Sequence, residues 1–362
     1  MSFSLPKYTA VDFSSDIFKN APNATLIPAP RDGAAPDDYH ATTIFPEYFK
    51  IEGEWHLAEE SRMDSVAVWN GERILVAEFR ALKEGDLIVC GRTEDGSCGI
   101  FVHTNGFECE DASQAGAFAF RTGRSRETAY SRDYDELYEL MRYERENGGH
   151  VVFVMGPACT FDHDSRNGFS KLVEAGYVGA ILAGNALATH DLEAAYYETA
   201  LGQHVYTQES FAGGHYNHID TINRVRRSGS IPKFIEEYNI KGGIIASAVK
   251  AGVPLVLAGS IRDDGPLPEV IADAYEAQSA MREQISKATV VVCIATTLHS
   301  IAAGNMTPSY RVINGVVRPV YLYSVDISEF SVNKLRDRGS LAVKTIVTNA
   351  QDFIVQLSRA LV

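Results

Sequence analysis

The chain has 362 residues, of which 45% are hydrophobic and 22% are charged, proportions that are typical of a folded globular protein. Its 33 Lys and Arg residues against 47 Asp and Glu residues give a net charge of −14, which argues against nucleic-acid binding. The five cysteines form no C-x-x-C pair, and we find no signal peptide and no apolar run of the ~20 residues that a membrane span needs. We therefore expect a cytoplasmic protein with reduced thiols and no metal site.

The first part of the chain predicts three segments. Residues 1–37 contain N-A-P-N, P-A-P and D-G-A-A-P-D-D, which indicate an extended arm. Residues 38–130 are expected to form a small β-rich domain, because short alternating runs are separated by turn residues: Y-F-K-I, E-W-H-L, S-V-A-V-W, R-I-L-V-A-E-F and D-L-I-V-C. Residues 131–149 predict a connecting helix that ends near Gly148 and Gly149.

Residues 150–362 alternate between strand-like and helix-like patterns. Six runs are apolar throughout: V-V-F-V-M-G, Y-V-G-A-I-L-A-G, P-L-V-L-A-G, T-V-V-V-C-I-A, P-V-Y-L-Y-S-V-D and V-K-T-I-V-T. Helical patterns such as P-E-V-I-A-D-A-Y-E-A-Q-S-A-M-R-E-Q-I-S-K separate them. Such strands are typical of a parallel sheet covered on both faces, so the predicted fold class is α/β, with about six strands in a doubly wound, Rossmann-like sheet.

Small or hydrogen-bonding residues follow nearly every one of these strands. Ligands of open parallel sheets bind beyond the carboxyl ends of the strands, so these residues are candidates for a binding site. They are Asn185 and Ala186, then Arg262, Asp263, Asp264 and Gly265, then Thr296, Thr297, Leu298 and His299, then Asp326, and finally Asn349 and Ala350.

The residue types at these strand ends favour a nucleotide. Asp326 could accept hydrogen bonds from ribose hydroxyls, and Thr296 and Thr297 could present hydroxyl and N–H groups to a phosphate. Alternatively, Asp326 caps a helix that begins near Ser328, and Thr297 caps the helix that contains His299. The first strand is not followed by G-x-G-x-x-G, which argues against an ordinary dehydrogenase.

Several long motifs are shared with a known family. From His150 onward the chain resembles the NAD-dependent ornithine cyclodeaminases of the archaeal and cyanobacterial type, which share a region similar to lysine-oxoglutarate reductase/saccharopine dehydrogenase and have a deoxyhypusine-synthase-like NAD fold. Upstream, Y-H-A-T-T and G-E-W-H-L-A-E-E-S-R-M-D are also similar, so the resemblance covers about residues 38–362. The motifs downstream are G-Y-V-G-A-I-L-A-G-N-A-L-A-T-H-D-L-E, G-G-H-Y-N-H-I-D-T-I-N-R-V-R-R-S-G-S-I, V-L-A-G-S-I-R-D-D-G-P-L-P, E-A-Q-S-A-M-R-E, T-T-L-H-S-I-A-A-G-N-M, V-D-I-S and K-L-R-D-R-G-S.

The resemblance implies an NAD cofactor, an amino-acid substrate, and a homodimer or homotetramer. It implies a reaction in which NAD takes a hydride from the α-carbon of L-ornithine, the δ-amine closes a ring, ammonia leaves, and the hydride returns to give proline. It also implies that NAD is contacted by Asn185, Ala186, Asp264, Thr296, Thr297, Leu298, His299, Asp326, Asn349 and Ala350.

Four residues are candidates for the chemistry itself: Arg262, Asp263, Asp264 and His299. Arg262 could clamp the substrate α-carboxylate, while Asp263, Asp264 or His299 could act as the general base. Alternatively, Arg262 and Asp263 pair with each other or with neighbours and brace the turn before Pro266.

One loop departs from the family pattern, so the resemblance does not determine which amino acid or amine is the substrate. Where the family has consecutive glycines after its first strand, this chain has G-P-A-C-T-F-D-H-D-S-R-N-G, so the pocket around residues 158–168 is expected to differ. A dehydrogenase or an aminoalkyl transferase that acts on another amino acid or amine is therefore the alternative function.

Asp162, His163 and Asp164 in this loop fit ordinary surface chemistry better than a metal site. His215 and His218 are expected to line the pocket or cap a helix. The connection N-M-T-P-S-Y-R-V-I-N-G-V-V-R-P is also longer than usual in the family.

Overall fold

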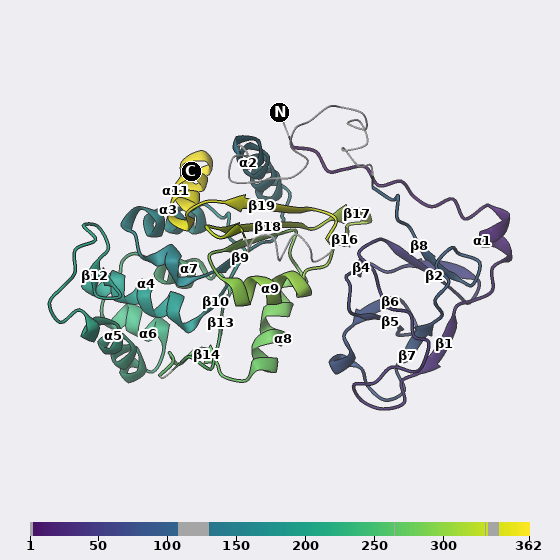
Figure 1. Ribbon diagram of the computed structural model, residues 1–362, viewed down its shortest axis with the longest axis horizontal. Helices are drawn as coiled ribbons and strands as arrows, with labels where there is room; N and C mark the ends of the chain where they lie inside the picture. The colour runs from purple at the N-terminus through teal and green to yellow at the C-terminus, as the bar shows by residue number, and fades with distance from the viewer. Residues whose placement is uncertain (1–2, 108–129, 264, 330, 332–339) are drawn as a thin grey trace.

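The computed structural model describes residues 3–107, 130–263, 265–329, 331 and 340–362. These residues form two lobes of unequal size (Figure 1). The smaller, N-terminal lobe is built from antiparallel strands, and the larger lobe is built around one seven-stranded sheet with helices packed against it. The expected fold class, an α/β Rossmann-like sheet preceded by a smaller β-rich region, is confirmed.

The N-terminal lobe contains two antiparallel sheets, in the orders β1-β7-β5-β6 and β3-β2-β8. All five runs that the sequence marks as strands form strands, and β1 is added from residues 1–37, where an extended arm and the short helix α1 (Asp16–Asn20) also lie. The strands are β1 (Thr25–Pro28), β2 (Glu47–Ile51), β3 (Glu54–Leu57), β5 (Val66–Trp69), β6 (Ile74–Ala77), β7 (Leu87–Cys90) and β8 (Ile100–Val102).

The sheet of the larger lobe is parallel throughout, in the order β14-β13-β10-β9-β15-β18-β19. Six of its strands are the expected apolar runs. They are β9 (Val151–Met155), β10 (Ala180–Gly184), β13 (Leu255–Ala258), β15 (Val290–Ile294), β18 (Tyr321–Asp326) and β19 (Val343–Val347).

The seventh strand is β14 (Val270–Ile271). The sequence pattern predicts a helix for these two residues, and that prediction is wrong. They pair with Leu257 and Ala258 of β13 instead. The helix, α8 (Ala274–Ile285), begins after them because the Asp273 side chain accepts hydrogen bonds from the N–H groups of Tyr275 and Glu276, at 2.8 and 2.9 Å. This N-cap sets the helix start.

Helices cover both faces of the sheet, as a doubly wound fold requires. Along β9 the side chains alternate: Val151, Phe153 and Met155 pack into one hydrophobic core, and Val152 and Val154 into the other. The first core is covered by α2 (Ser131–Glu146), α3 (His163–Glu174), α4 (Asn185–Tyr197), α7 (Ile244–Ala251) and α11 (Ala350–Leu361). The second core is covered by α8 and α9 (Thr297–Met306).

The strand order reverses between β9 and β15, and there the two strand ends meet closely. Gly156, directly after β9, donates its N–H to the carbonyl of Ile294 at 2.8 Å. A Cβ atom on Gly156 would lie 1.9 Å from the carbonyl oxygen of Ala295, which itself has a φ of +50°. Only glycine fits this contact. Ligand sites of doubly wound sheets open at this kind of switch point.

A β-hairpin joins the two lobes. It consists of β16 (Tyr310–Ile313) and β17 (Val316–Pro319), and it lies within the connection that precedes β18. Asn314 and Gly315 both have positive φ, as an Asn-Gly turn between two strands requires. Because β16 also pairs with β4 (Glu60–Ser61), the hairpin ties the parallel-sheet lobe to the N-terminal lobe (Figure 1).

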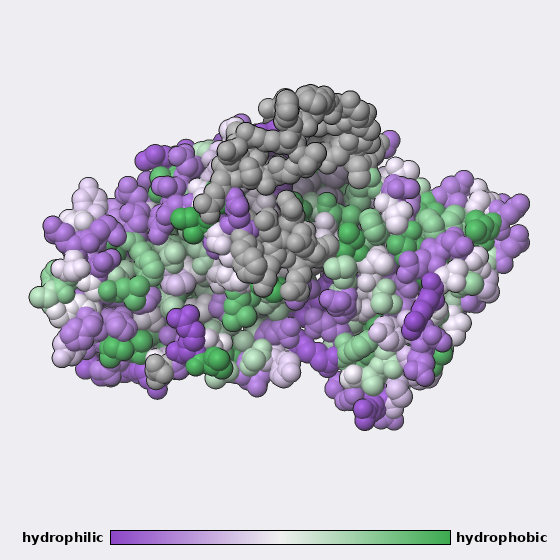
Figure 2. Space-filling model, in the orientation of Figure 1, coloured by the Kyte–Doolittle hydropathy of each residue, from purple (hydrophilic) through white to green (hydrophobic). Residues whose placement is uncertain are grey.

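The described helices include none that combines the length and the apolar composition needed to cross a membrane. In Figure 2 hydrophilic and hydrophobic side chains are interspersed over both lobes on the face that is shown.

Candidate functional site

The candidate residues follow the carboxyl ends of neighbouring strands of the parallel sheet. Asn185 directly follows β10, Thr296 comes two residues after β15, and Asn349 comes two residues after β19, while Asp326 is the last residue of β18. Because all these strands run in the same direction, the residues share one edge of the sheet, and this edge includes the switch point. Asp264, another predicted site residue, lies outside the described residues.

The N-terminus of α9 offers unused donors beside the switch point. The N-cap is Thr296, with an extended backbone and no capping hydrogen bond from its side chain, so the expectation that Thr297 caps this helix is wrong. The Thr297 hydroxyl lies 3.3 Å from that of Ser331, and Leu298 is 68% exposed. The free N–H groups at a helix N-terminus and the positive end of the helix dipole bind phosphate well.

Asp326 and Asn349 both bond to their own loops. Asp326 Oδ1 accepts a hydrogen bond from the N–H of Ser328 at 2.8 Å, as the capping alternative predicts. With the residues that the structure describes, Asp326 Oδ2 makes no hydrogen bond and could accept one from a ligand. Asn349 Oδ1 caps α11 through the N–H of Gln351 at 2.8 Å, and Ala350 is nearly buried behind it.

Asn185 fixes the loop that follows β13. Its side-chain oxygen accepts a hydrogen bond from the N–H of Leu267 at 3.0 Å, and the residue is 9% exposed. The loop of residues 259–268, which carries Arg262 and Asp263, is thereby held against the first turn of α4, where Ala186 lies. Sequence reasoning assigned Asn185 to the cofactor alone and missed this positioning role.

His299 lies against the end of β10 and is affected electrostatically by Asp263. A Cβ on Gly184, the last residue of β10, would lie 3.0 Å from His299 Cε1, so the imidazole rests on the glycine. Burial lowers the pKa of His299, and the negative charge of Asp263 acts in the opposite direction. His299 is therefore neutral at neutral pH, when it can accept a proton.

The loop geometry separates the roles of Arg262 and Asp263. Asp263 Oδ2 accepts a hydrogen bond from the N–H of Ser260 at 2.9 Å and braces the loop, as one alternative predicts. The two residues do not form an ion pair with each other, and the Arg262 side chain is exposed. The guanidinium has no ion-pair partner among the described residues, so it is available to a carboxylate.

A second polar cluster lies on α4. Glu193 is fully buried and its Oε2 lies 2.9 Å from His190 Nδ1, while its Oε1 accepts a hydrogen bond from the Thr199 hydroxyl at 3.0 Å. The His218 ring centroid is 6.0 Å from that of His190, and His218 Nδ1 is buried without a partner. The pairing of His190 with Glu193 is not among the sequence-based predictions, although a histidine and a glutamate three residues apart on one helix face are the signal that points to it.

The altered loop lies against this cluster. The Phe161 ring centroid is 5.7 Å from that of His190. Asp162 is the N-cap of α3, because its Oδ2 accepts a hydrogen bond from the N–H of Ser165 at 2.9 Å. Nowhere in the described chain do three or more His, Cys, Asp or Glu side chains gather in a way that could hold a metal ion.

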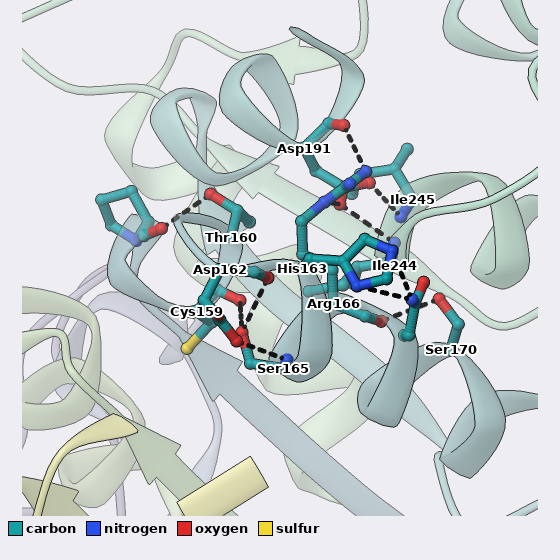
Figure 3. A network of polar contacts seen from close by, with 12 residues as sticks. Cys159, Thr160, Asp162, His163, Ser165, Arg166, Ser170, Asp191, Ile244 and Ile245 are labelled. Atoms are coloured by element: carbon teal, nitrogen blue, oxygen red, sulfur yellow. Dashed lines mark hydrogen bonds and ion pairs between the residues drawn. The ribbon is translucent and has the colours of Figure 1, made fainter. Parts of the chain in front are cut away.

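Asp191, which follows His190 on α4, serves the fold (Figure 3). It is fully buried and accepts a hydrogen bond from Nε of Arg166 at 2.9 Å and from the N–H groups of Ile244 and Ile245 at 3.0 and 2.8 Å. A Cβ on Gly243, whose φ is +106°, would lie 2.6 Å from Nη2 of Arg166. The network joins α3, α4 and the N-terminus of α7.

The residues at the carboxyl edge fit a dinucleotide. The N-terminus of α9 supplies N–H donors and an uncapped hydroxyl at Thr296, and Asp326 on the neighbouring strand keeps an oxygen for ribose hydroxyls. Gly156 and Gly184 allow Ala295 and His299 to pack closely against the ends of β9 and β10, since a Cβ on either glycine would meet these residues.

Comparisons with known proteins identify the family of the chain. The family described as "Arginine dihydrolase ArgZ-like, C-terminal, Rossmann fold" matches residues 135–357. An ornithine cyclodeaminase from Methanococcus maripaludis is 36% identical over 348 residues, which cover 94% of this chain and 79% of that protein. The bifunctional arginine dihydrolase/ornithine cyclodeaminase AgrE from Nostoc is 34% identical over 96% of this chain, and the match covers 48% of AgrE.

Two solved structures share the fold. The crystal structure of a conserved putative LOR/SDH protein from Methanococcus maripaludis superposes with a TM-score of 0.84, at 36% identity, covering 94% of this chain and 98% of that one. The ternary complex of AgrE with ornithine and NAD⁺ gives a TM-score of 0.58, at 32% identity, covering 94% of this chain and 46% of that one. This chain therefore belongs to the NAD-dependent ornithine cyclodeaminase family of the archaeal and cyanobacterial type, a family of ammonia-lyases.

Proposed function

We propose that the protein converts L-ornithine to L-proline and ammonia with NAD as a recycled cofactor. The observation that carries this proposal is that hydrogen-bonding residues of the shared motifs lie together at the switch point of a sheet whose relatives include an NAD⁺ and ornithine complex. Ornithine equals proline plus ammonia in atoms and in oxidation state, so no external oxidant is consumed.

Bound NAD supplies a hydride acceptor that later returns the hydride to the same carbon skeleton. Asp326 holds the ribose hydroxyls through the oxygen that Ser328 does not occupy. Thr296 and Thr297, at the N-terminus of α9, donate hydrogen bonds to the pyrophosphate. Asn185 keeps the loop of residues 259–268 against this edge.

His299 acts as the general base that collects the proton of the substrate α-ammonium. Its lowered pKa keeps the imidazole neutral at neutral pH, and Asp263 stabilises the imidazolium that forms when the proton arrives. Arg262, exposed and without an ion-pair partner among the described residues, binds the α-carboxylate and so orients the α-carbon.

A second candidate function is supported by the altered loop. Phe161 lies against His190 where the family resemblance predicts glycine, so the space for the substrate side chain differs. A dehydrogenase or aminoalkyl transferase that acts on a different amino acid or amine is the function that this change favours.

The direct test is to incubate the purified protein and NAD⁺ with ornithine, lysine and shorter diamino acids, and to identify products by mass spectrometry. Ornithine is expected to give proline and one ammonia per turnover without accumulation of NADH. Steady NADH formation would favour a dehydrogenase, transfer to an added amine would favour a transferase, and cofactor binding without turnover of any diamino acid would contradict catalysis.

Two variants separate the proposed roles. Asp326→Ala is expected to weaken NAD binding about tenfold, since hydrogen bonds to a charged group are worth ~1.5–3 kcal/mol.

Arg262→Ala is expected to raise KM for ornithine about tenfold and to leave NAD affinity unchanged. NAD affinity is measured by calorimetry and KM by ammonia release. Equal loss of NAD affinity in both variants would contradict this division.

A further inference from the structure

A cavity of about 310 Å³ lies at the amino edge of the parallel sheet, opposite the candidate cofactor edge. His150 precedes β9 and Thr289 precedes β15, so the cavity lies at the starts of the two strands whose ends form the switch point. Strands of this length rise about 3.3 Å per residue, which separates the two sites by roughly 15 Å. The lining residues are residues 147–150, Lys287, Thr289, residues 311–314 and Arg318.

The cavity is basic although the protein as a whole is acidic. Lys287, Arg311 and Arg318 bring three cationic side chains to its wall, and His150 adds an imidazole. Two of the cations, Arg311 and Arg318, come from the β16–β17 hairpin, inside the connection that precedes β18.

Two nitrogen atoms at this wall are buried without a hydrogen-bond partner. They are Nε of Arg318, a residue that is 6% exposed, and Nε2 of His150. The terminal nitrogens of Arg318 bind the buried carboxylate of Glu144, so only its Nε lacks an acceptor. A buried donor without an acceptor is costly, and these two atoms have almost no exposed surface, so a ligand in the cavity reaches them only if neighbouring side chains shift.

The acidic groups near the cavity leave Arg311 without a close partner. Glu144 is occupied by Arg318, and Glu283 pairs with Lys287 at 3.0 Å on the exposed side of α8. Glu60 acts on Arg311 electrostatically, but no ion pair within 4.0 Å joins the two side chains. Arg311 therefore retains donors for a ligand.

Two of the cations that line the cavity also act on the pKa of His150. Burial lowers it, and Lys287 and Arg311 lower it further, while Gln284 acts in the opposite direction. An anion in the cavity would offset the repulsion from both cations.

We propose that this cavity is a second ligand site, separate from the cofactor edge, that binds the phosphate or carboxylate group of a small molecule. Arg311 supplies a planar guanidinium group that suits either anion, while Lys287 and Arg318, whose terminal nitrogens are held by Glu144, add positive charge to the lining. The volume lies at the lower end of the range for small-molecule sites, which excludes a whole dinucleotide and fits a metabolite with one or two anionic groups.

A ligand here would contact the end of α2, the end of α8 and the hairpin that pairs with β4. It would therefore connect elements of the parallel-sheet lobe with β16, the strand that pairs with β4. Binding to the folded protein alone would raise the melting temperature as ligand concentration increases, approximately with the logarithm of the concentration above Kd.

The test uses the full chain and two probes, inorganic phosphate and succinate, titrated by calorimetry and by thermal unfolding at constant ionic strength. At least one probe is expected to bind and to raise Tm. A stronger response to phosphate identifies a phosphorylated ligand, and a stronger response to succinate identifies a carboxylate ligand.

Arg311→Gln is expected to weaken probe binding at least about tenfold, since it removes charge-assisted hydrogen bonds. Lys287→Gln, in the exposed segment that follows α8, tests the same site if Arg311→Gln does not fold. Arg132→Gln is the matched control, because Arg132 lies at the far end of α2 and is 80% exposed. Binding that is equally strong in Arg311→Gln, Lys287→Gln and Arg132→Gln, or absent for both probes in the unaltered protein, would overturn the proposal.

Discussion

The buried carboxylate of Asp191 and the strand-end carboxylates of Asp263 and Asp326 show two uses of the same group. The oxygens of Asp191 accept hydrogen bonds from one guanidinium nitrogen and two backbone N–H groups, and the residue is fully buried. Asp263 and Asp326 each accept one backbone hydrogen bond from the described residues and remain partly exposed.

This difference distinguishes a carboxylate that stabilises the fold from carboxylates that can bind a ligand. A carboxylate whose oxygens are saturated inside the protein has no capacity left for a ligand, and removing its charge leaves its partners unpaired. A carboxylate with one oxygen held and the other open is oriented by the fold and still able to bind. The following changes test this comparison.

Asp191→Asn is expected to have the largest effect on stability. It leaves the Arg166 guanidinium buried without its counter-charge, and removing one partner of a buried ion pair costs ~3–5 kcal/mol. The free energy of unfolding is measured by urea titration. Asp164→Asn, on the exposed side of the same α3, is the control and is expected to change stability by less than ~0.5 kcal/mol. Equal stability of the two variants would show that the buried network is not structural.

Gly156→Ala tests the close contact at the switch point. The added Cβ would meet the Ala295 carbonyl at 1.9 Å, and overpacking of this kind costs ~1–3 kcal/mol. Because β9 and β15 must separate, NAD affinity is expected to fall together with stability, as calorimetry and urea unfolding would measure. Gly242→Ala, where an added Cβ meets nothing within 4 Å, is the control. An unchanged NAD affinity in Gly156→Ala would place the cofactor away from the switch point.

Asp263→Asn is expected to have the smallest effect, a shift in the pH dependence of kcat/KM. Asp263 raises the pKa of His299, so its neutralisation lowers that pKa further. Activity that needs neutral His299 is lost as the pH falls through its pKa, so the acid limb moves to lower pH. Stability is expected to change little, because asparagine still accepts the hydrogen bond of Ser260. An acid limb that moves to higher pH would exclude His299 as the base.

Local sequence patterns predicted most of the fold. Apolar runs of four or more residues identified six strands of the parallel sheet, because buried parallel strands need apolar residues on both faces. The two-residue strand β14 was assigned to a helix, since its pairing with β13 is a contact between segments and leaves no periodicity in the sequence.

The sequence predicts which residues follow the strand ends and so form the candidate site. It does not predict which hydrogen bonds these residues make. Asn185 and Asp263 have internal hydrogen bonds that depend on how the loop of residues 259–268 folds back. His190 and Glu193 are visible as a pair only when the helix is known to be buried at that face.

The sequence by itself determined the alternation of strands and helices, the family, and the edge of the sheet at which polar residues gather, because these follow from periodicity and from motifs along the chain. Only the tertiary structure decided which carboxylates are saturated and which stay open, where Gly156 meets Ala295, and that a basic cavity forms at the opposite edge. Those features depend on distances between segments far apart in the chain, which burial and packing set together.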